Sequence, residues 1–130
     1  MLVKFKVFDK QLKIVREVKN IDYENSELLF DAYVKEDGSK NIETYRGFDD
    51  VIFMMSTGLK DKNGVEIYEG DICAAYSGDL AENYKVKWSE KYCTWMIEGD
   101  FDIEFLRDFA RHISCEVIGN IYEGSQLYQE

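Results

Sequence analysis

The sequence predicts a mainly β protein with a minor α component. Short apolar or alternating segments are separated by polar turns along nearly the whole chain, and only one stretch has clear helical periodicity. In residues 55–130 the short strands carry many large aromatic side chains, which is typical of a small SH3-like β-barrel. Residues 1–54 are expected to form a β-rich N-terminal region. No Pro- or Ser-rich linker separates the two regions, so we expect them to pack together.

The N-terminal region is predicted to contain a hairpin followed by two further strands. Residues 1–8 alternate between polar and apolar side chains, and residues 12–18 are expected to form the returning strand. Residues 27–34 are expected to form the third strand, although their first part could also form a helical turn. A loop with a glycine at position 38 follows, and residues 41–46 are expected to pair back across it.

Residues 48–56 are compatible with two structures. Their apolar positions are continuous from Val51 to Met55, which fits a buried strand. Asp49 or Asp50 could instead cap a short helix. We favour a strand or irregular segment that leads into the barrel, and we place the boundary between the two regions near the end of this segment.

Residues 57–73 organise the chain because they contain two turns in close succession. Asp61-Lys-Asn-Gly64 is a turn signal, since Asn and Gly tolerate positive φ and Asp can accept hydrogen bonds from its own backbone. Glu69-Gly-Asp71 is the second turn, and the apolar residues 72–76 after it are expected to form a buried strand. A chain that turns twice here and then enters an apolar strand opens a small, strongly bent β-unit.

The same turns carry a family resemblance. The segments Gly58-Leu-Lys-Asp-Lys-Asn-Gly64 and Glu66-Ile-Tyr-Glu-Gly-Asp-Ile72 occur together with Val117-Ile-Gly-Asn-Ile-Tyr-Glu123 near the end. With Phe5 and Phe8-Asp-Lys10 at the start, the combination resembles the YopX family of bacteriophage and prophage proteins. The resemblance implies a β-rich phage protein in a group without an established activity, and it supplies no catalytic residues.

Two strands and the turn between them are predicted in the middle of the barrel region. Residues 84–88 and 93–97 are expected to be partner strands, joined by a turn that contains Tyr92. In the first strand the apolar residues alternate with two lysines, so they should share one buried face. The side chains expected on that face are Tyr84, Val86 and Trp88.

One helix is predicted, at about residues 101–111. Its apolar side chains recur at spacings of three and four residues, which places them on one face of a helix. Acidic residues lie at its start, and Arg107 and Arg111 lie near its end, an order that complements the helix dipole. Residues 115–122 after the helix are expected to form the last strand.

The formal net charge of −10 bears on the class of partner. Nucleic-acid affinity depends largely on Lys and Arg side chains that neutralise phosphates, so this charge argues against a nucleic-acid-binding surface. An acidic protein can instead dock on a basic protein partner. An acidic surface that serves only solubility is the simpler interpretation.

The three cysteines, Cys73, Cys93 and Cys115, are widely spaced. An odd number without a close pair does not fit a disulfide framework or a zinc site. Each cysteine lies in an apolar run, so we expect buried free thiols. The sequence contains neither an export signal nor a membrane-spanning run, which leads us to expect a cytoplasmic location, in a bacterial host if the resemblance holds.

The sequence offers few residues suited to a chemical site. The single histidine, His112, lies where the predicted helix ends and is expected to interact with the last carbonyl groups. Acidic residues at 49–50 and 98–104 could supply oxygen ligands to Mg²⁺ or Ca²⁺, but the second cluster lacks the central glycine of a calcium loop. We therefore expect no metal site, no cofactor and no catalytic residue.

Three functions follow as hypotheses. The favoured one is a non-enzymatic accessory protein that acts through protein–protein contacts and forms a homo-oligomer. Tyr92, which should be exposed in its turn, is the candidate contact residue. The alternative is a nucleic-acid-associated barrel module with Lys85 and Lys87 as a local basic stripe. The third is a metal-dependent hydrolase that uses the acidic residues at 98–104.

Overall fold

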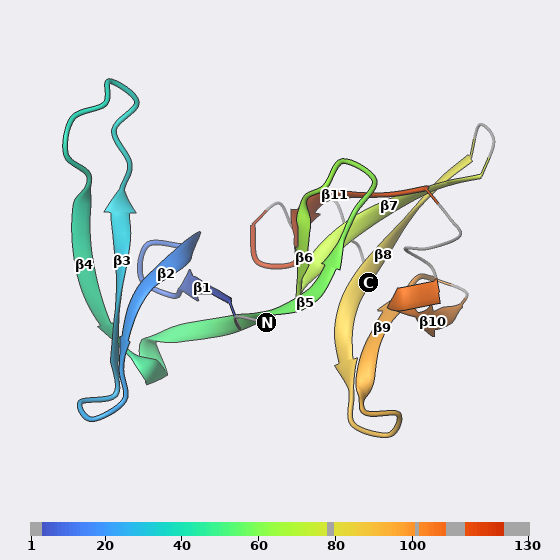
Figure 1. Ribbon diagram of the computed structural model, residues 1–130, viewed down its shortest axis with the longest axis horizontal. Coiled ribbons are helices and arrows are strands. Elements are labelled where there is room, and N and C mark those ends of the chain that lie inside the picture. Colours follow the sequence, from blue (N-terminus) through green and yellow to red (C-terminus); the bar gives the residue numbers. More distant parts are fainter. Residues whose placement is uncertain (1–3, 78–79, 101, 109–113, 124–130) are drawn as a thin grey trace. The chain divides into compact units, whose positions relative to one another are not determined.

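The residues that the computed structural model describes are 4–77, 80–100, 102–108 and 114–123 (Figure 1). Within them most of the regular structure is β-strand, and the strands form two antiparallel sheets. The prediction of a mainly β protein is therefore confirmed. The chain divides into two compact units, Met1–Met55 (unit 1) and Ser56–Glu130 (unit 2). Strand β5 (Val51–Lys60) contributes to both units.

Unit 1 is an antiparallel meander. Its strands are β1 (Phe5–Asp9), β2 (Ile14–Asp22), β3 (Glu27–Tyr33), β4 (Ile42–Gly47) and the first half of β5. Strands β1 to β4 pair in sequence, and β5 returns to pair with β1, which gives the order β4-β3-β2-β1-β5. The N-terminal hairpin and the two strands predicted after it are all present.

The core of unit 1 is built from alternate side chains of these strands. The most deeply buried ones are Val7, Leu28, Phe30 and Val51. Alternate residues of a strand point to opposite faces, so each strand contributes one apolar face to this core. Phe48, in the short 3₁₀ helix η1 (Phe48–Asp50), packs against it. The sequence of residues 48–56 is compatible with either a strand or a short helix. The structure contains one helical turn there, followed by strand β5.

A buried ion pair joins two strands of unit 1. Asp9 on β1 is fully buried, and its carboxylate accepts hydrogen bonds from the backbone N–H of Leu12 (3.0 Å) and from Nε of Arg46 on β4 (3.0 Å). Strands β2 and β3 lie between β1 and β4 in the sheet order. The sheet must therefore curl strongly to bring these two side chains together.

Unit 2 contains a five-stranded antiparallel sheet. Its strands are β7 (Asp71–Ser77), β8 (Leu80–Ser89), β9 (Thr94–Glu98), β10 (Ile103–Phe105) and β11 (Ser114–Asn120), in the order β10-β9-β8-β7-β11. The second half of β5 pairs with β6 (Glu66–Tyr68). The core of the unit consists of Ile67, Cys73, Ala75, Tyr84, Val86, Ile97, Leu106 and Cys115.

The strand pairings described for unit 2 give an open order, with β10 and β11 at its two ends. No closed barrel is found among the described strands. The SH3-like barrel expected for residues 55–130 therefore stays a prediction, while the antiparallel β-architecture of this region is established.

The prediction of a helix at residues 101–111 is wrong for the first part of that segment. Ile103–Phe105 is strand β10, and Phe105 lies opposite Met96 of β9. Apolar and acidic residues alternate in this segment, so its sequence fits a period of two as well as a helical period. Because the segment pairs with β9, it forms a strand and not a helix. The described helical residues are 106–108, and the remainder of the predicted segment lies outside the described residues.

Candidate functional site

The first of the two motif turns is built on the carboxylate of Asp61. Its Oδ1 accepts hydrogen bonds from the backbone N–H groups of Asn63 (2.8 Å) and Val65 (2.9 Å), and its Oδ2 accepts one from the N–H of Val117 on β11 (2.9 Å). Burial opposes ionisation of Asp61, but these three N–H donors outweigh that effect and lower its pKa. One side chain thus closes the turn and attaches the last strand to it.

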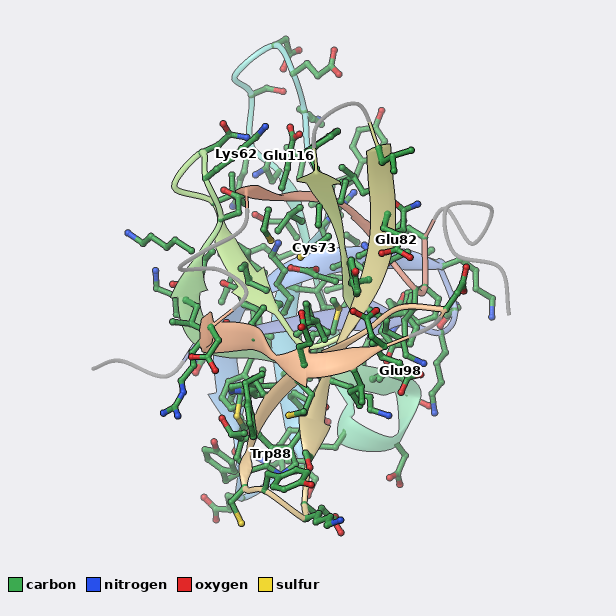
Figure 2. All side chains as sticks on the ribbon, turned by 90° about the vertical axis from the view of Figure 1, so that its right-hand side faces the viewer. Lys62, Cys73, Glu82, Trp88, Glu98 and Glu116 are labelled. Atoms are coloured by element: carbon green, nitrogen blue, oxygen red, sulfur yellow. The ribbon has the colours of Figure 1, made fainter. Side chains whose placement is uncertain are left out.

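The residues next to Asp61 add further contacts to β11. The backbone N–H of Lys62 donates to the carbonyl of Cys115 (2.9 Å), and Nζ of Lys62 lies 3.8 Å from the carboxylate of Glu116. Asn63 donates a weaker hydrogen bond to the same carboxylate (3.4 Å). Figure 2 shows Lys62 and Glu116 next to each other. The first and last motif segments, far apart in sequence, are therefore neighbours in space.

The second motif turn is also held by backbone hydrogen bonds. Gly70 has a φ of +86°, which a residue with a Cβ adopts only with strain. Its N–H donates to the carbonyl of Val86, and its carbonyl accepts from the N–H of Ile121 (both 2.9 Å). The buried carboxylate of Asp71 accepts from the N–H of Tyr68 (2.7 Å). The polar atoms of both turns thus serve the fold of unit 2.

The register of β8, β9 and β10 sorts their side chains onto two faces. Val86 lies opposite Ile97 and Trp88 opposite Trp95, so these four residues share a face, which leads into the core. The opposite face carries polar, charged and apolar side chains from all three strands. Its residues are Lys85, Lys87, Met96, Glu98, Ile103 and Phe105. We call it the hairpin face.

Carboxylates gather on the core side, around Tyr84. The hydroxyl of Tyr84 donates to Oε2 of Glu82 (2.5 Å). Burial raises the pKa of Tyr84, and the hydrogen bond to Glu82 and the nearby charges of Asp102 and Glu104 raise it further. The phenol therefore stays protonated at neutral pH and serves as a hydrogen-bond donor within the fold.

Tyr92 lies in the β8–β9 turn, at the edge of the hairpin face. Its backbone N–H donates to Oγ of Ser89 (3.2 Å), and the next residue, Cys93, has a φ of +51° that allows the chain to reverse. The Tyr92 side chain is 54% exposed. Its ring meets the ring of Phe105 edge-on, with the centroids 5.5 Å apart and the planes at 79°.

A cation lies over each of these two rings. Nζ of Lys91 is 5.2 Å from the centroid of the Tyr92 ring, and the guanidinium carbon of Arg107 is 6.0 Å from the centroid of the Phe105 ring. Ile103, on the same face as Phe105, is half exposed. The result is an exposed apolar patch with positive charge at its rim. The period-two alternation of the sequence could have placed Ile103 and Phe105 on one face of a strand, but it could not show that this face adjoins Tyr92.

Trp88 differs from its prediction as a buried residue. Its side chain is 44% exposed, and its ring packs edge-on against Trp95, with the centroids 5.0 Å apart. Figure 2 shows Trp88 towards the turn end of β8, away from Glu82. The residue lies on the core side of the strand as predicted, but the core ends before the strand does, so alternation alone overestimates its burial.

The predicted basic stripe of Lys85 and Lys87 lies on the hairpin face. Nζ of Lys87 lies 2.5 Å from a carboxylate oxygen of Glu98, and this hydrogen bond is the main cause of the lowered pKa of Glu98. The charge of Lys87 is therefore largely matched within the protein.

A family model matches nearly the whole chain. The model for the YopX protein covers residues 4–129. The chain belongs to the YopX family. The resemblance that the motif segments indicated is therefore confirmed. A solved structure, that of protein EF1440 from Enterococcus faecalis, is similar to this YopX family member at 26% identity, with 99% of each chain covered and a TM-score of 0.64. No curated protein matches the chain.

The cysteines of this YopX protein are in two environments. Cys73 on β7 and Cys115 on β11 are buried in the core as expected, and a hydrogen bond between their thiols raises the pKa of Cys73. Cys93 is exposed, which contradicts its prediction as a buried thiol. Its left-handed backbone places it in the β8–β9 turn, before the partner strand begins.

The acidic residues at 98–104 are divided between the two faces of the sheet. Glu98 pairs with Lys87 on the hairpin face, whereas Asp102 and Glu104 lie near Tyr84. Among the described residues, no group of His, Cys, Asp and Glu side chains is arranged to hold a metal ion. His112 lies outside the described residues. Within the described part of the chain, no helix is long and apolar enough to span a membrane.

Proposed function

We propose that this YopX protein is a non-enzymatic phage or prophage accessory protein that works through protein–protein contacts in the bacterial cytoplasm. The observation that carries the proposal is the exposed ring of Tyr92 in edge-on contact with the half-buried ring of Phe105 on the hairpin face. We further propose that the protein forms a homo-oligomer and that residues 55–130 close into an SH3-like barrel.

Exposed aromatic side chains favour a role in binding. Tyr and Trp are enriched among the residues that contribute most to protein interfaces, because they cover a large area and lose little conformational freedom. Three aromatic rings lie near the β8–β9 turn. The exposed Tyr92 and the half-buried Phe105 lie on one side of the sheet, and the exposed Trp88 lies on the other. The net charge of −10 favours a partner that is basic as a whole, because it steers oppositely charged proteins over long range.

Affinity capture from a lysate of the bacterial host, followed by mass spectrometry, tests the proposal. We expect a defined partner to be captured by the unmodified protein and lost with the double variant Tyr92→Ala/Phe105→Ala. The matched control is Tyr45→Ala, which removes a tyrosine that is 62% exposed in unit 1. Circular dichroism verifies that the variants are folded. The proposal is wrong if no partner is captured, or if the double variant captures the same partner as well as the control does.

The homo-oligomer has its own test. Size-exclusion chromatography with light scattering, over a range of concentrations, should give a mass above the 15.3 kDa of one chain. A monomer at every concentration contradicts that part of the proposal.

The alternative, a nucleic-acid-associated module, is supported by the position of Lys85 and Lys87 on the same face as Phe105. The pairing of Lys87 with Glu98 and the net charge of −10 both weaken it. Filter binding of single-stranded nucleic acid at low salt separates the two functions. Retention that falls steeply as salt is added supports the alternative, and no retention, or retention insensitive to salt, excludes it.

A further inference from the structure

The hairpin face has a local charge opposite to that of the whole chain. Lys85 and Lys87 project from β8 onto this face, Lys91 lies in the turn, and Arg107 follows β10. The strand register places one acid, Glu98, on the same face. A second acid, Asp108, lies beside Arg107, whereas the carboxylates of Glu82, Asp102 and Glu104 lie near Tyr84.

The two cations nearest the aromatic pair remain available to a partner. Lys91 has a contact to the Tyr92 ring and no carboxylate within ion-pairing distance among the described residues. Arg107 lies 3.8 Å from its neighbour Asp108, with both side chains mostly exposed, and such surface pairs contribute little. Both side chains can therefore donate to an incoming carboxylate while their stems still cover the rings.

From this arrangement we infer that the hairpin face binds a short acidic segment of a partner protein. An apolar side chain of that segment packs on the rings of Tyr92 and Phe105 and on Ile103, and its carboxylates pair with Lys91 and Arg107. The inference rests on the proposed function and specifies the chemistry of the partner at this site. A partner that is basic as a whole is compatible with it, because long-range attraction depends on net charge whereas contact depends on charges within about one Debye length, roughly 8 Å.

The same observations favour a peptide over a nucleic acid. Successive bases bind aromatic residues by stacking on their ring faces. The two rings here meet edge-on at 79°, so they do not form a flat platform. A long polyanion would in addition experience the charge of −10 of the entire chain, whereas a short segment contacts only the hairpin face.

The test is a backbone-amide NMR titration of the full chain with defined probes. The first probe is a short synthetic peptide with glutamates on both sides of one tryptophan. The second is its charge-reversed counterpart, with lysine in place of each glutamate, and the third is an oligothymidylate of similar length. We expect the glutamate peptide to shift the amides of Lys91, Tyr92 and Phe105, and the lysine peptide to leave them unchanged.

Charge reversal separates the site from the effect of net charge. Lys91→Glu should weaken binding of the glutamate peptide by about tenfold or more, as expected for loss of a charge-assisted contact. Lys35→Glu, an exposed lysine in unit 1, changes the net charge by the same amount and should leave the affinity within about twofold.

Several outcomes overturn the inference. They are equal shifts with the lysine peptide, no shift or shifts elsewhere with the glutamate peptide, tighter binding of oligothymidylate at these amides, and equal weakening by the two lysine variants. Concentration-dependent shifts of Lys91 and Tyr92 without any peptide would assign the face to a second copy of this chain and also overturn it. If the captured partner depends on Tyr92 and Phe105 while the glutamate peptide does not bind, the inference fails and the proposed function stands.

Discussion

At the scale of single residues, Asp61 explains why the motif turn has its particular composition. A carboxylate can accept several hydrogen bonds through two oxygens, and this one receives N–H groups from Asn63, Val65 and Val117. Gly64, with a φ of +80°, lets the chain return so that Val65 reaches the same oxygen as Asn63. The turn thus needs both an acceptor with two oxygens and a residue that tolerates positive φ.

We predict that Asp61→Asn destabilises the protein by about 1–3 kcal/mol, measured as the free energy of unfolding in urea. The side chain of Asn keeps only one acceptor oxygen. Its NH₂ group would face a backbone N–H group that the second carboxylate oxygen accepted from in the unmodified protein. The control is Asp37→Asn in unit 1, where an exposed carboxylate accepts hydrogen bonds from Ser39 at a loop. Equal losses for the two variants would contradict the role assigned to Asp61.

The same residue gives a pH dependence with a defined sign. Because the pKa of Asp61 is lower in the folded protein than its unfolded value of about 3.9, its contribution is complete above that value and is lost as the pH falls through the folded pKa. We therefore predict that the urea midpoint of the unmodified protein falls more steeply below about pH 4 than that of Asp61→Asn. Parallel curves would show that the three N–H donors do not stabilise the charged form.

Among the secondary-structure elements, strand β10 is the one that sequence periodicity alone cannot place, and its pairing with β9 and the turn at Gly99 fix its position. The alternation in β10 becomes a strand through pairing with β9, and the connection between them turns at Gly99, whose N–H donates to the carbonyl of Asp102 (2.9 Å). A Cβ on Gly99 would lie 2.7 Å from an atom of the buried Tyr84 ring. The ring of Tyr84 therefore leaves no room for a side chain at position 99.

Gly99→Ala should consequently destabilise unit 2 by about 1–3 kcal/mol, because the ring of Tyr84 has little freedom to move. The fluorescence of Trp88 and Trp95 during urea unfolding provides the measurement, since both tryptophans of the chain lie in unit 2. Gly38→Ala serves for comparison. It has a φ of +79° but open space around it, so its cost should be limited to about 1 kcal/mol of backbone strain. A smaller loss for Gly99→Ala than for Gly38→Ala would contradict the close approach.

The ion pair between β1 and β4 makes a corresponding prediction for unit 1. Arg46→Met should cost about 3–5 kcal/mol in the free energy of unfolding, because it leaves the fully buried carboxylate of Asp9 without its cation. The double variant Asp9→Leu/Arg46→Met should recover much of that loss, since it removes the uncompensated charge together with its partner. If the double variant is as unstable as the sum of the two single variants, the residues do not act as a pair.

At the scale of the whole molecule, the net charge of −10 sets the response to salt. Like charges repel one another more strongly in the compact state, and salt screens this repulsion. We predict that the urea midpoint rises as sodium chloride is increased at neutral pH. The variant Glu24→Gln/Glu36→Gln, which removes two exposed negative charges, should respond less. A midpoint that falls with salt would indicate that attractive ion pairs outweigh the repulsion.

The sequence was most informative where structure depends on neighbouring residues. The strands of the N-terminal meander, the turn at Asp61 and the exposed turn that contains Tyr92 could be read from alternation and turn chemistry. It was less informative where structure depends on distant partners. The proximity of Tyr92 to Phe105 could not be predicted, because it depends on the cross-strand register of β9 and β10.

A mainly β chain, two motif turns and membership of the YopX family could be inferred without coordinates, because local backbone preferences and side-chain alternation are properties of adjacent residues. Three features could be known only from the folded chain: Ile103–Phe105 forms a strand, Asp61 attaches β11, and the ring of Phe105 lies against that of Tyr92. These features arise from strand pairing between distant segments. Pairing fixes the face on which each side chain lies, and that choice is not contained in the local pattern.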